Sequence, residues 1–376
     1  MSWTQKTLGE IVNLKRGFDL PSSNRINGPY PVFSSSGQTG THSEAAVKGP
    51  CVVTGRYGTI GQVFFSDAAC WPLNTSLYST DFKGNDPKFV YYLLKTIPWR
   101  DYLTASAVPG INRNHVHLCP VCVPDHETQT AISSVLGLLD NKIELNTKLN
   151  GYLEELLLAQ FTALSPNENW TEGRADSYYE IGIGKTPPRK EPEWFSDVKA
   201  DNHVWLSIKD MGEAGTYSLD SSEYLTDAAV NAKNVRRVPA GSVLLSFKLT
   251  VGRVKIAGCN MTTNEAIACF ASDDKRKLAY AYPYLRSFDF GKLGSTSSIA
   301  TAVNSKTVKA MPFAMPGDLE LSEFYLSTKP IYEQLLVTAK ESRFLAQLRD
   351  VLLPKLMSGE IDVSKVDLTK LNSHLA

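Results

Sequence analysis

Four residues near position 117 have the types and spacing of metal ligands. His115, His117, Cys119 and Cys122 alternate along a short stretch, and imidazole and thiolate groups are the usual protein ligands of zinc. On a strand, the first three side chains would share one face. A similar stretch lies 192 residues further on, where the equivalent positions hold residues that do not normally bind zinc: Thr307, Lys309, Met311 and Ala314. We therefore predict no metal site here, but a strand that leads into a helix.

A second stretch, from Gly182 to Thr186, reads Gly-Ile-Gly-Lys-Thr and is similar to a phosphate-binding loop. Such a loop needs another glycine five residues before Gly184, and Tyr179 stands there. Pro187 and Pro188 also prevent the helix whose N-terminus would hold the phosphate. The sequence therefore argues against nucleotide binding at this loop.

Other patterns that carry chemistry are absent from the sequence. It has no Asn-Pro-Pro-aromatic or Asp-Pro-Pro-Tyr tetrapeptide of an amino-methyltransferase, no Gly-x-Ser-x-Gly elbow, no His-Glu-x-x-His and no Gly-x-Gly-x-x-Gly. The paired acids Asp273-Asp274 and Glu154-Glu155 are expected on the solvated surface, in loops or on a helix face. These observations favour a binding protein over an enzyme.

The length and composition of the chain limit the number of domains and the kinds of partner that it can have. A chain of 376 residues, 43% of them apolar, has room for two or three domains with proper cores. The 39 basic and 39 acidic residues give no net charge that indicates nucleic acid, although a local basic face is enough to contact phosphates. No apolar run is long enough to cross a membrane, and residues 1–6 lack the apolar stretch of a secretory signal. We therefore expect a cytoplasmic protein whose 6 cysteines are reduced thiols.

The elements that must position the polar residues are repeated within the chain. The stretch from Asn112 to Pro124 returns as Asn304 to Pro316, with Asn, Val, Pro and Pro at the same offset of 192 residues. A long amphipathic stretch follows each copy. This duplication predicts two similar modules, each followed by its own helix, in a protein that contacts two separate places on one partner.

Each module is predicted to be a compact mixture of helices and strands. Residues 51–54 and 62–65 read as strands on either side of a glycine-containing turn, and residues 89–94 read as a short helix. Residues 240–246 and 250–254 repeat the pair of strands. We predict an α+β fold in which two mixed α/β modules are held apart by two long antiparallel helices, with a pseudo-two-fold repeat. The expected bounds are 1–124 for the first module, 125–164 for the first helix, 165–317 for the second module, 318–358 for the second helix and 359–376 for a tail.

Both long helices carry an apolar stripe with heptad-like spacing. Asp125 is the expected N-cap of the first helix, while Pro330 is expected to start or kink the second helix and Pro354 to end it. Two exposed stripes are most simply buried against each other, which favours a helix pair over two helices that pack on their own modules. The residues expected at the helix interface are Ile132, Leu136, Leu139, Ile143, Leu153, Leu157, Ile331, Leu335, Leu345, Leu348 and Leu352.

The loops of both modules are rich in residues that read nucleic acid. Arg and Lys contact phosphates or guanine, while Asn and Gln suit adenine, although no single exposed residue of this kind is diagnostic. The candidate DNA contacts of the first module are Lys15, Arg16, Ser35, Gln38, Arg56, Tyr57, Thr59, Asn74, Arg113 and Asn114. Those of the second module are Lys185, Arg189, Lys209, Lys248, Thr250, Arg253, Asn264 and Lys306.

Nearly the whole chain resembles the specificity subunit of a type I restriction–modification system. Trp3 with Leu8-Gly9-Glu10-Ile11 is similar to the opening of a target recognition domain, and Gly184-Lys185-Thr186-Pro187 with 205–211 is similar to the opening of a second one. Residues 138–146 resemble the central spacer helix of the family. Residues 348–361, which read LRDVLLPKLMSGEI, resemble its C-terminal end and are the most specific string.

The resemblance implies a subunit without catalysis of its own. Each recognition domain would read one half of a bipartite DNA site, and the helix pair would set the gap between the halves. The implied partners are double-stranded DNA, two modification subunits that carry S-adenosylmethionine and methylate adenine N6, and restriction subunits that translocate and cleave. No cofactor is expected on this chain and no membrane partner.

The modules differ where they should read different bases, because Arg56-Tyr57-Gly58 stands in the first where Phe247-Lys248-Leu249 stands in the second. We therefore predict an asymmetric site. A two-module scaffold or adhesion protein on a coiled coil is the alternative, and it would bind no DNA even with its partners. A stand-alone enzyme is a further alternative, and it would turn over a substrate without partners. The subunit could also serve a system that only methylates DNA. The sequence of this chain does not separate that case from a full restriction system, because the difference lies in another gene.

Overall fold

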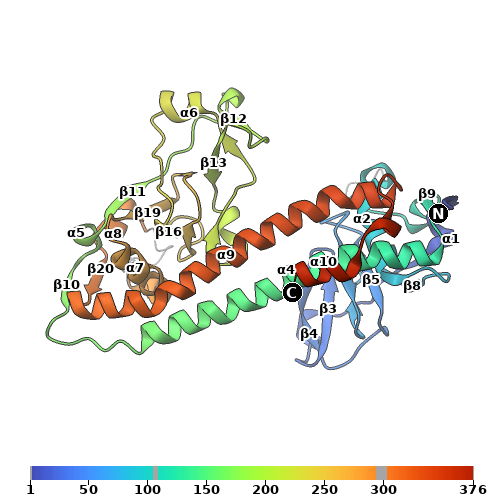
Figure 1. The fold of residues 1–376 in the computed structure, drawn as a ribbon, viewed down its shortest axis with the longest axis horizontal. Coiled ribbons are helices and arrows are strands. Elements are labelled where there is room, and N and C mark those ends of the chain that lie inside the picture. The colour runs from blue at the N-terminus through green and yellow to red at the C-terminus, as the bar shows by residue number, and fades with distance from the viewer. Residues whose placement is uncertain (1, 105–108, 294–302, 376) are drawn as a thin grey trace. The chain divides into compact units, whose positions relative to one another are not determined.

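Two compact units share two long helices. A computed structural model describes residues 2–104, 109–293 and 303–375. Unit 1 comprises Met1–Lys142 and Leu345–Ala376, and unit 2 comprises Ile143–Phe344. Both predicted long helices are present, as α4 (His126–Thr162) and α9 (Asp318–Met357), and each contributes one part to each unit (Figure 1). Unit 1 is therefore discontinuous in sequence, whereas unit 2 is continuous. Among the described residues, no helix is both long and apolar enough to cross a membrane.

Unit 1 is built on three small sheets. The largest is antiparallel with the order β2 (Asn13–Arg16), β8 (Ser76–Asp81), β5 (Cys51–Gly55) and β6 (Val63–Ser66). The predicted strands over 51–54 and 62–65 are thus paired with each other. The others are β4 (Gly37–His42), β3 (Tyr30–Ser34) and β7 (Trp71–Pro72) in that order, and the pair β1 (Thr4–Thr7) with β9 (Pro120–Val123). Short helices complete the unit: α1 (Leu8–Ile11), η1 (Ser22–Asn24), α2 (Pro87–Thr96), η2 (Trp99–Tyr102) and α3 (Arg113–Val116).

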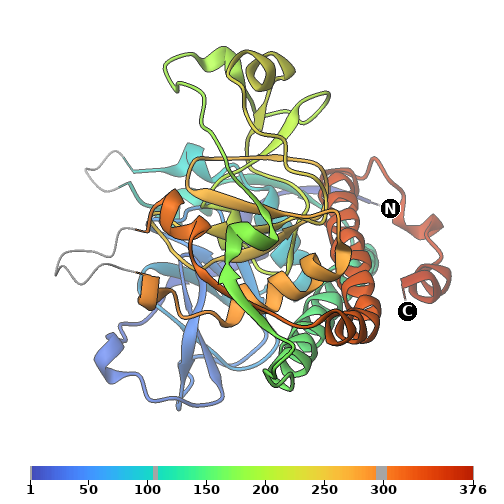
Figure 2. The same cartoon turned by 90° about the vertical axis from the view of Figure 1, so that its left-hand side faces the viewer.

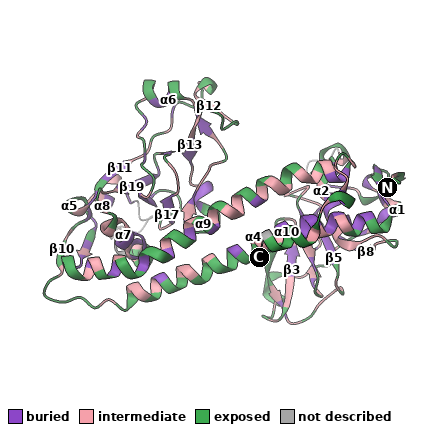
Figure 3. Ribbon diagram, in the orientation of Figure 1, coloured by how far each residue is buried: buried purple, intermediate pink, exposed green. Residues whose placement is uncertain are grey.

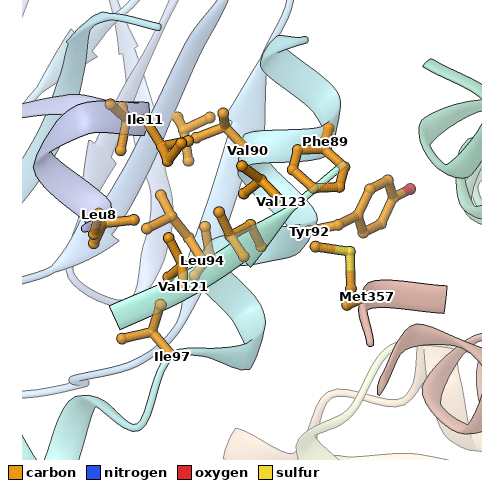
Figure 4. Packing of buried hydrophobic residues seen from close by; sticks show 14 of the residues in the cluster. Leu8, Ile11, Phe89, Val90, Tyr92, Leu94, Ile97, Val121, Val123 and Met357 are labelled. Carbon is orange, nitrogen blue, oxygen red and sulfur yellow. The ribbon is translucent and has the colours of Figure 1, made fainter. Parts of the chain in front are cut away.

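The core of unit 1 lies between the sheets, α2 and parts of both long helices. The Asp86 carboxylate accepts a hydrogen bond from the Phe89 amide at 2.7 Å and caps α2, which starts at Pro87. Figure 4 shows Phe89, Val90 and Leu94 of α2 packed with side chains of α1 and β9, and Met357 of α9 beside Tyr92. Complete burial of an apolar side chain of this size contributes about 1.5–3 kcal/mol. The last turn of α9 is therefore part of the core that the N-terminal module needs.

Unit 2 repeats these sheets with insertions. Its main sheet has the order β11 (Glu180–Ile183), β19 (Ile267–Ala271), β16 (Val243–Ser246), β17 (Val254–Ala257) and β14 (Tyr217–Ser218). A second sheet orders β12 (Phe195–Ser196), β15 (Tyr224–Leu225), β13 (His203–Leu206) and β18 (Thr262–Thr263), and β10 (Thr171–Arg174) pairs with β20 (Pro312–Met315). The helices are α5 (Ala175–Tyr178), η3 (Pro192–Trp194), η4 (Asp210–Gly212), α6 (Asp227–Ala232), α7 (Lys275–Ser287), η5 (Phe290–Leu293) and α8 (Ser305–Lys309). Both views place α6 at the end of unit 2 that is remote from α9 (Figures 1 and 2).

The repeat extends to individual hydrogen bonds. The order β2-β8-β5-β6 in unit 1 corresponds to β11-β19-β16-β17 in unit 2. The Arg56 amide donates to the Thr75 carbonyl at 2.9 Å, and the Phe247 amide donates to the Ala266 carbonyl at 2.9 Å. Asn112 and Asn304 each cap the short helix that follows them. Equivalent positions of the two modules can therefore be compared residue by residue.

The ends of the long helices agree only in part with the prediction. The Asp125 carboxylate accepts a hydrogen bond from the Thr128 amide at 2.9 Å, so Asp125 caps α4 as predicted. The bounds expected for the second helix, 318–358, agree with α9, but the expectation that Pro330 starts this helix and Pro354 ends it was wrong, since α9 continues through both. Buried side chains around Pro330, such as Ile331 and Leu335, hold the helix in place despite the missing amide donor.

The two long helices contact each other and their modules within each unit. In unit 2, the Asn146 amide group donates to Glu341 at 2.7 Å, and the Thr338 hydroxyl donates to Asn150. Leu157, Ile331 and Leu335 belong to the core of unit 2, and Ile132 and Leu136 belong to the core of unit 1. Figure 3 shows buried and half-buried segments alternating with exposed ones along both helices. Leu139 and Leu345 are buried, Ile143, Leu153, Leu348 and Leu352 are half-buried. The two long helices therefore pack both against each other and against the modules, so the two arrangements that were alternatives from the sequence are both present.

The tail after α9 packs on unit 1. It contains η6 (Val363–Lys365) and α10 (Leu368–Leu375), and Val363 is buried in the core of unit 1. Gly359 has φ +76°, and a Cβ atom added there would lie 2.7 Å from Trp3 Nε1. The segment after α9 is thus fitted against the first strand region of the chain.

Candidate nucleic-acid interface

Five of the predicted DNA contacts line one cavity of unit 1. It has a volume of about 280 Å³ and lies where β2 and β5 end, beside α3. We call it the arginine cavity, because three arginines line it. The predicted residues in its lining are Arg16, Arg56, Tyr57, Arg113 and Asn114, and the others are Leu77, Thr104, Gly110, Ile111 and Asn112.

Backbone hydrogen bonds hold these loops together. Arg16 is the last residue of β2 and lies opposite Leu77 of β8. The Ile111 amide donates to the Arg56 carbonyl at 3.0 Å, and Tyr57 and Gly110 form an isolated β-bridge. A Cβ atom on Gly110 would lie 2.2 Å from the Tyr57 ring, so only glycine permits this approach. The signal that could have revealed Gly110 is its place just before the repeated Asn112 segment.

The arginine cavity carries positive charge without acidic partners. Within the described part of the chain, none of Arg16, Arg56 and Arg113 forms an ion pair. The Arg56 Cζ atom lies 4.6 Å from the centre of the Tyr57 ring, which orients its guanidinium group. Three unpaired guanidinium groups around a small cavity favour an anionic or acceptor-rich ligand, such as a phosphate or the O6 and N7 atoms of guanine.

The positive charge of the arginine cavity also affects His117, which follows α3 directly. Its Nε2 atom accepts a hydrogen bond from the Leu14 amide at 3.1 Å. Partial burial, and then the positive charge of Arg113, lower the pKa of His117 below its usual 6.5. The neutral ring therefore helps to fix β2 next to the cavity, rather than to bind metal.

The predicted strand that leads into a helix is present as β9 before α4, but its expected extent over residues 115–119 was wrong. His115 lies in α3, His117 follows it, and the strand β9 begins only at Pro120. Asn112 explains the difference, because its side chain accepts a hydrogen bond from the Asn114 amide at 3.0 Å and starts a helical turn. In the described ranges, no group of three or more His, Cys, Asp or Glu residues could hold a metal ion.

The prediction for the acidic pairs holds for Asp273 and Glu155, which are exposed, but was wrong for Glu154 and Asp274. Glu154 of α4 accepts hydrogen bonds from the Tyr282 hydroxyl at 2.7 Å and from Arg286 Nε at 3.0 Å, and its side chain is 20% exposed. Asp274 caps α7 and forms an ion pair with Arg276 at 2.8 Å. Both carboxylates therefore hold elements of unit 2 together instead of lying free on the surface.

The sequence of the chain is similar to those of several known proteins. Residues 1–155 match the family model of the type I restriction modification DNA specificity domain. The type I restriction enzyme HindI specificity subunit of Haemophilus influenzae is 22% identical, over 96% of this chain and 99% of its own length. The MjaIX specificity subunit of Methanocaldococcus jannaschii is 23% identical over 74% of this chain and 70% of its own.

A solved structure shares the fold over almost the whole length. The S subunit of a type I restriction-modification system from M. genitalium aligns with a TM-score of 0.59 and 15% identity, over 94% of this chain and 96% of that one. Residues 1–155 belong to the family of type I restriction modification DNA specificity domains, and nearly the whole chain is similar to a type I specificity subunit. The resemblance noted in the sequence is thereby confirmed.

Other predicted contacts in unit 1 of this specificity subunit lie outside the arginine cavity. Ser35 lies next to the loop after β5, since a Cβ atom on Gly58 would be 3.6 Å from its hydroxyl. Asn74 donates a hydrogen bond to Asp19. Lys15 and Gln38 are exposed, and Thr59 is half-buried.

In unit 2 of the specificity subunit, three predicted contacts have partners within the chain. Lys185 Nζ donates to the Lys233 carbonyl at 2.5 Å, and Arg253 Nη1 donates to the Ile208 carbonyl at 2.6 Å. Arg189 bonds both carboxylate oxygens of Glu223 at 2.6 and 2.8 Å. Its guanidinium group also stacks on the rings of Phe195 and Trp205. These contacts reduce the freedom of the three side chains to meet DNA.

The remaining predicted contacts of unit 2 are more accessible. Lys209, Lys248, Thr250 and Lys306 are exposed. Asn264 is half-buried and accepts a hydrogen bond from the Ala266 amide at 3.1 Å. The positions equivalent to the three arginines of the cavity hold no cation: Ile183, Phe247 and Ser305. The two modules of the specificity subunit therefore present different chemistry at equivalent places.

Proposed function

We propose that this specificity subunit selects the DNA sequence on which a type I restriction–modification complex acts. The observation that carries the proposal is the arginine cavity, with its three unpaired guanidinium groups, in one of two repeated modules. Each module would read one half of a bipartite site, through 1–124 in the first and 165–317 in the second. The different residues at equivalent positions support an asymmetric site.

The first module would contact both phosphates and bases. Arg16, Arg56 and Arg113 offer bidentate donors, which suit guanine or a phosphate, and Asn114 suits adenine. The second module would use its exposed polar residues, Lys209, Lys248, Thr250 and Lys306. A neutral net charge is compatible with this proposal, because phosphate contact depends on a local basic face and partner subunits can share the DNA.

We further propose that the subunit contributes no catalysis and assembles with catalytic partners. Two modification subunits, which bind S-adenosylmethionine and methylate adenine N6, would dock on its helices and modules, and restriction subunits would join them. An apolar stripe on α4 supports docking of a partner helix, since its members are spaced by four, three and four residues. They are Leu145 at 61%, Leu149 at 39%, Tyr152 at 68% and Leu156 at 48% exposure. Because the partner is chromosomal DNA, we place the complex in the cytoplasm.

The helices α4 and α9, over about 125–164 and 318–358, would set the gap between the half-sites. Insertion of one heptad into both helices, at levels that face each other, is expected to lengthen the unspecified gap and to leave both half-sites unchanged. A gap of the original length in the methylated motif would count against this role.

A genome-wide map of N6-methyladenine tests the function as a whole. Cells with the gene and its modification partner should methylate an asymmetric two-part motif, and cells without the gene should lose methylation at that motif. Replacement of residues 1–124 by the first module of another specificity subunit should then change one half-site only. Identical maps, in cells where the partner is present and co-purifies with the subunit, would refute the proposal.

A further inference from the structure

The loop between β16 and β17 of unit 2 contains a leucine in a backbone conformation that favours glycine. Leu249 has φ +62°, and the equivalent residue in unit 1 is Gly58, with φ +71°. The next equivalent pair, Gly252 and Gly61, has φ +92° and +88°. The two loops therefore follow the same path, but unit 2 carries an isobutyl side chain where unit 1 carries none.

This leucine makes no visible contribution to the fold. Leu249 is 93% exposed, so it buries almost no apolar surface. A side chain in the left-handed region is also less favourable than glycine, because Cβ approaches the backbone carbonyl. The side chain therefore adds almost nothing to folding stability, and its backbone conformation lowers that stability. An exposed, strained apolar residue of this kind points to a role in binding.

The loop holds Leu249 in a fixed position. The Ser246 hydroxyl donates to the Thr250 carbonyl at 2.5 Å, and the Gly252 amide donates to the Ser246 carbonyl at 2.9 Å. Gly252 also lies against Phe290, since a Cβ atom there would be 3.1 Å from the ring. The backbone of such a clamped loop loses little conformational entropy when Leu249 meets a partner.

The neighbours of Leu249 suit a nucleic acid. Lys248 and Thr250 are exposed on either side of it, and Lys248 forms no ion pair within the described ranges. Val251, the next residue, is 37% exposed and extends the apolar tip. A cation that meets a phosphate, next to an apolar group that meets a base, is a common pairing at DNA interfaces.

We propose that Leu249 is an apolar base-contacting residue through which the second module reads its half-site. This rests on the proposed function. The isobutyl group would lie against the methyl group of a thymine or between two unstacked bases, and Lys248 would hold the adjacent phosphate. The first module, with Gly58 at this place, would read its half-site through the arginine cavity instead.

The test uses the subunit assembled with its modification partner and the DNA motif found in the methylation map. The variants are Leu249→Gly and Leu249→Ala, and the matched control is Val198→Ala, which changes another exposed apolar residue of unit 2 (65% exposed). We expect Leu249→Gly to unfold at the same temperature as the wild type or higher. Its affinity for the motif should fall by roughly 5- to 100-fold, the range for the loss of one base contact.

The loss should depend on sequence. Duplexes with single substitutions in each half-site should show that Leu249→Gly no longer discriminates at one or two positions of the second module's half-site, with the other half-site read as before. Deoxyuridine in place of thymine identifies a methyl contact if it weakens the wild type but not the variant. Increased fluorescence of 2-aminopurine at a step, lost in the variant, identifies insertion between bases.

Two results would overturn the inference: unchanged affinity in Leu249→Gly, or an equal loss on every duplex including unrelated sequences. Failure of the proposed function is a separate result, since the wild-type complex would then fail to distinguish its motif from scrambled DNA.

Discussion

The guanidinium group of Arg349 lies 2.7 Å from the Asp140 carboxylate and joins α9 to α4 within unit 1. The same carboxylate accepts a hydrogen bond from the Tyr92 hydroxyl of α2 at 2.7 Å. Burial, and then the charge of Asp140, raise the pKa of Tyr92 well above its usual value, so this hydroxyl stays a donor. Arg349 belongs to the string that resembles the C-terminal end of the family, and this contact gives that string a structural role.

Asp140→Asn should weaken unit 1 selectively. The side chains of Asp140 and Arg349 are 26% and 22% exposed, so loss of the charge leaves the partly buried guanidinium group with only the exposed carboxylate of Asp350. We expect the opening free energy of unit 1, measured by amide hydrogen exchange in β2, β5 and β8, to fall by about 1–3 kcal/mol. Asp350→Asn is the control, since Asp350 also pairs with Arg349 but is 65% exposed. Equal effects of the two changes would contradict this account.

Arg56→Ala should reduce the affinity of the assembled complex for its motif by about 1–3 kcal/mol, because a bidentate donor is lost from the arginine cavity. Competition with singly substituted duplexes separates two modes. Contact with a base relaxes specificity at one position, whereas contact with a phosphate weakens all sequences and lowers the salt dependence. Arg56→Lys should not restore affinity, since lysine lacks the planar fork. Lys48→Ala, at an exposed position outside the cavity, should have no effect.

His117 should make unit 1 less stable at mildly acidic pH. Its folded pKa lies below 6.5, so the unfolded chain takes up a proton first as the pH falls. The stability is complete above pH 6.5 and declines as the pH falls from there toward the folded pKa. His117→Gln should flatten this part of the profile of melting temperature against pH, whereas substitution of the exposed His115 by Gln should leave the wild-type slope. A slope that persists in His117→Gln would assign the pH response to another group.

Tyr152→Glu should impair assembly without harm to the fold. Tyr152 is 68% exposed at the centre of the apolar stripe on α4, and a carboxylate there would oppose burial against a partner helix. The yield of modification subunit that co-purifies should fall, with an unchanged melting temperature of the isolated chain. Leu118→Glu, at another exposed apolar residue (70%), is the control. Normal assembly of Tyr152→Glu would exclude the stripe as the docking site.

The sequence was informative where local signals and the repeat agreed. Asp125 as a helix cap, the strands around residues 51–54 and 62–65, and the two long helices all depend on neighbours in sequence, and all are present. The arginine cavity draws on residues as far apart as Arg16 and Arg113, which no local pattern brings together. The residues that gather there were predicted one by one as contacts, but their convergence required the fold.

Two of the errors have the same physical cause, which is long-range contact. Glu154 was expected in solvent, and its partner Arg286 lies far away in sequence on α7. Contact of Arg189 with DNA stays a prediction, and the contacts of its guanidinium group with Glu223 and two aromatic rings are likewise invisible to local patterns. Pro330 was expected to start or kink α9, and tertiary burial of its neighbours outweighs that local preference.

The discontinuity of unit 1 has a consequence for synthesis on the ribosome. Unit 2 is complete once residue 344 has been made, whereas unit 1 still lacks Leu356, Met357 and the Arg349 partner of Asp140. The module translated first is therefore the last to mature, and it must wait with part of its apolar core uncovered. A nonsense codon just after residue 344 would remove nothing from the second module and yet leave the first one aggregation-prone.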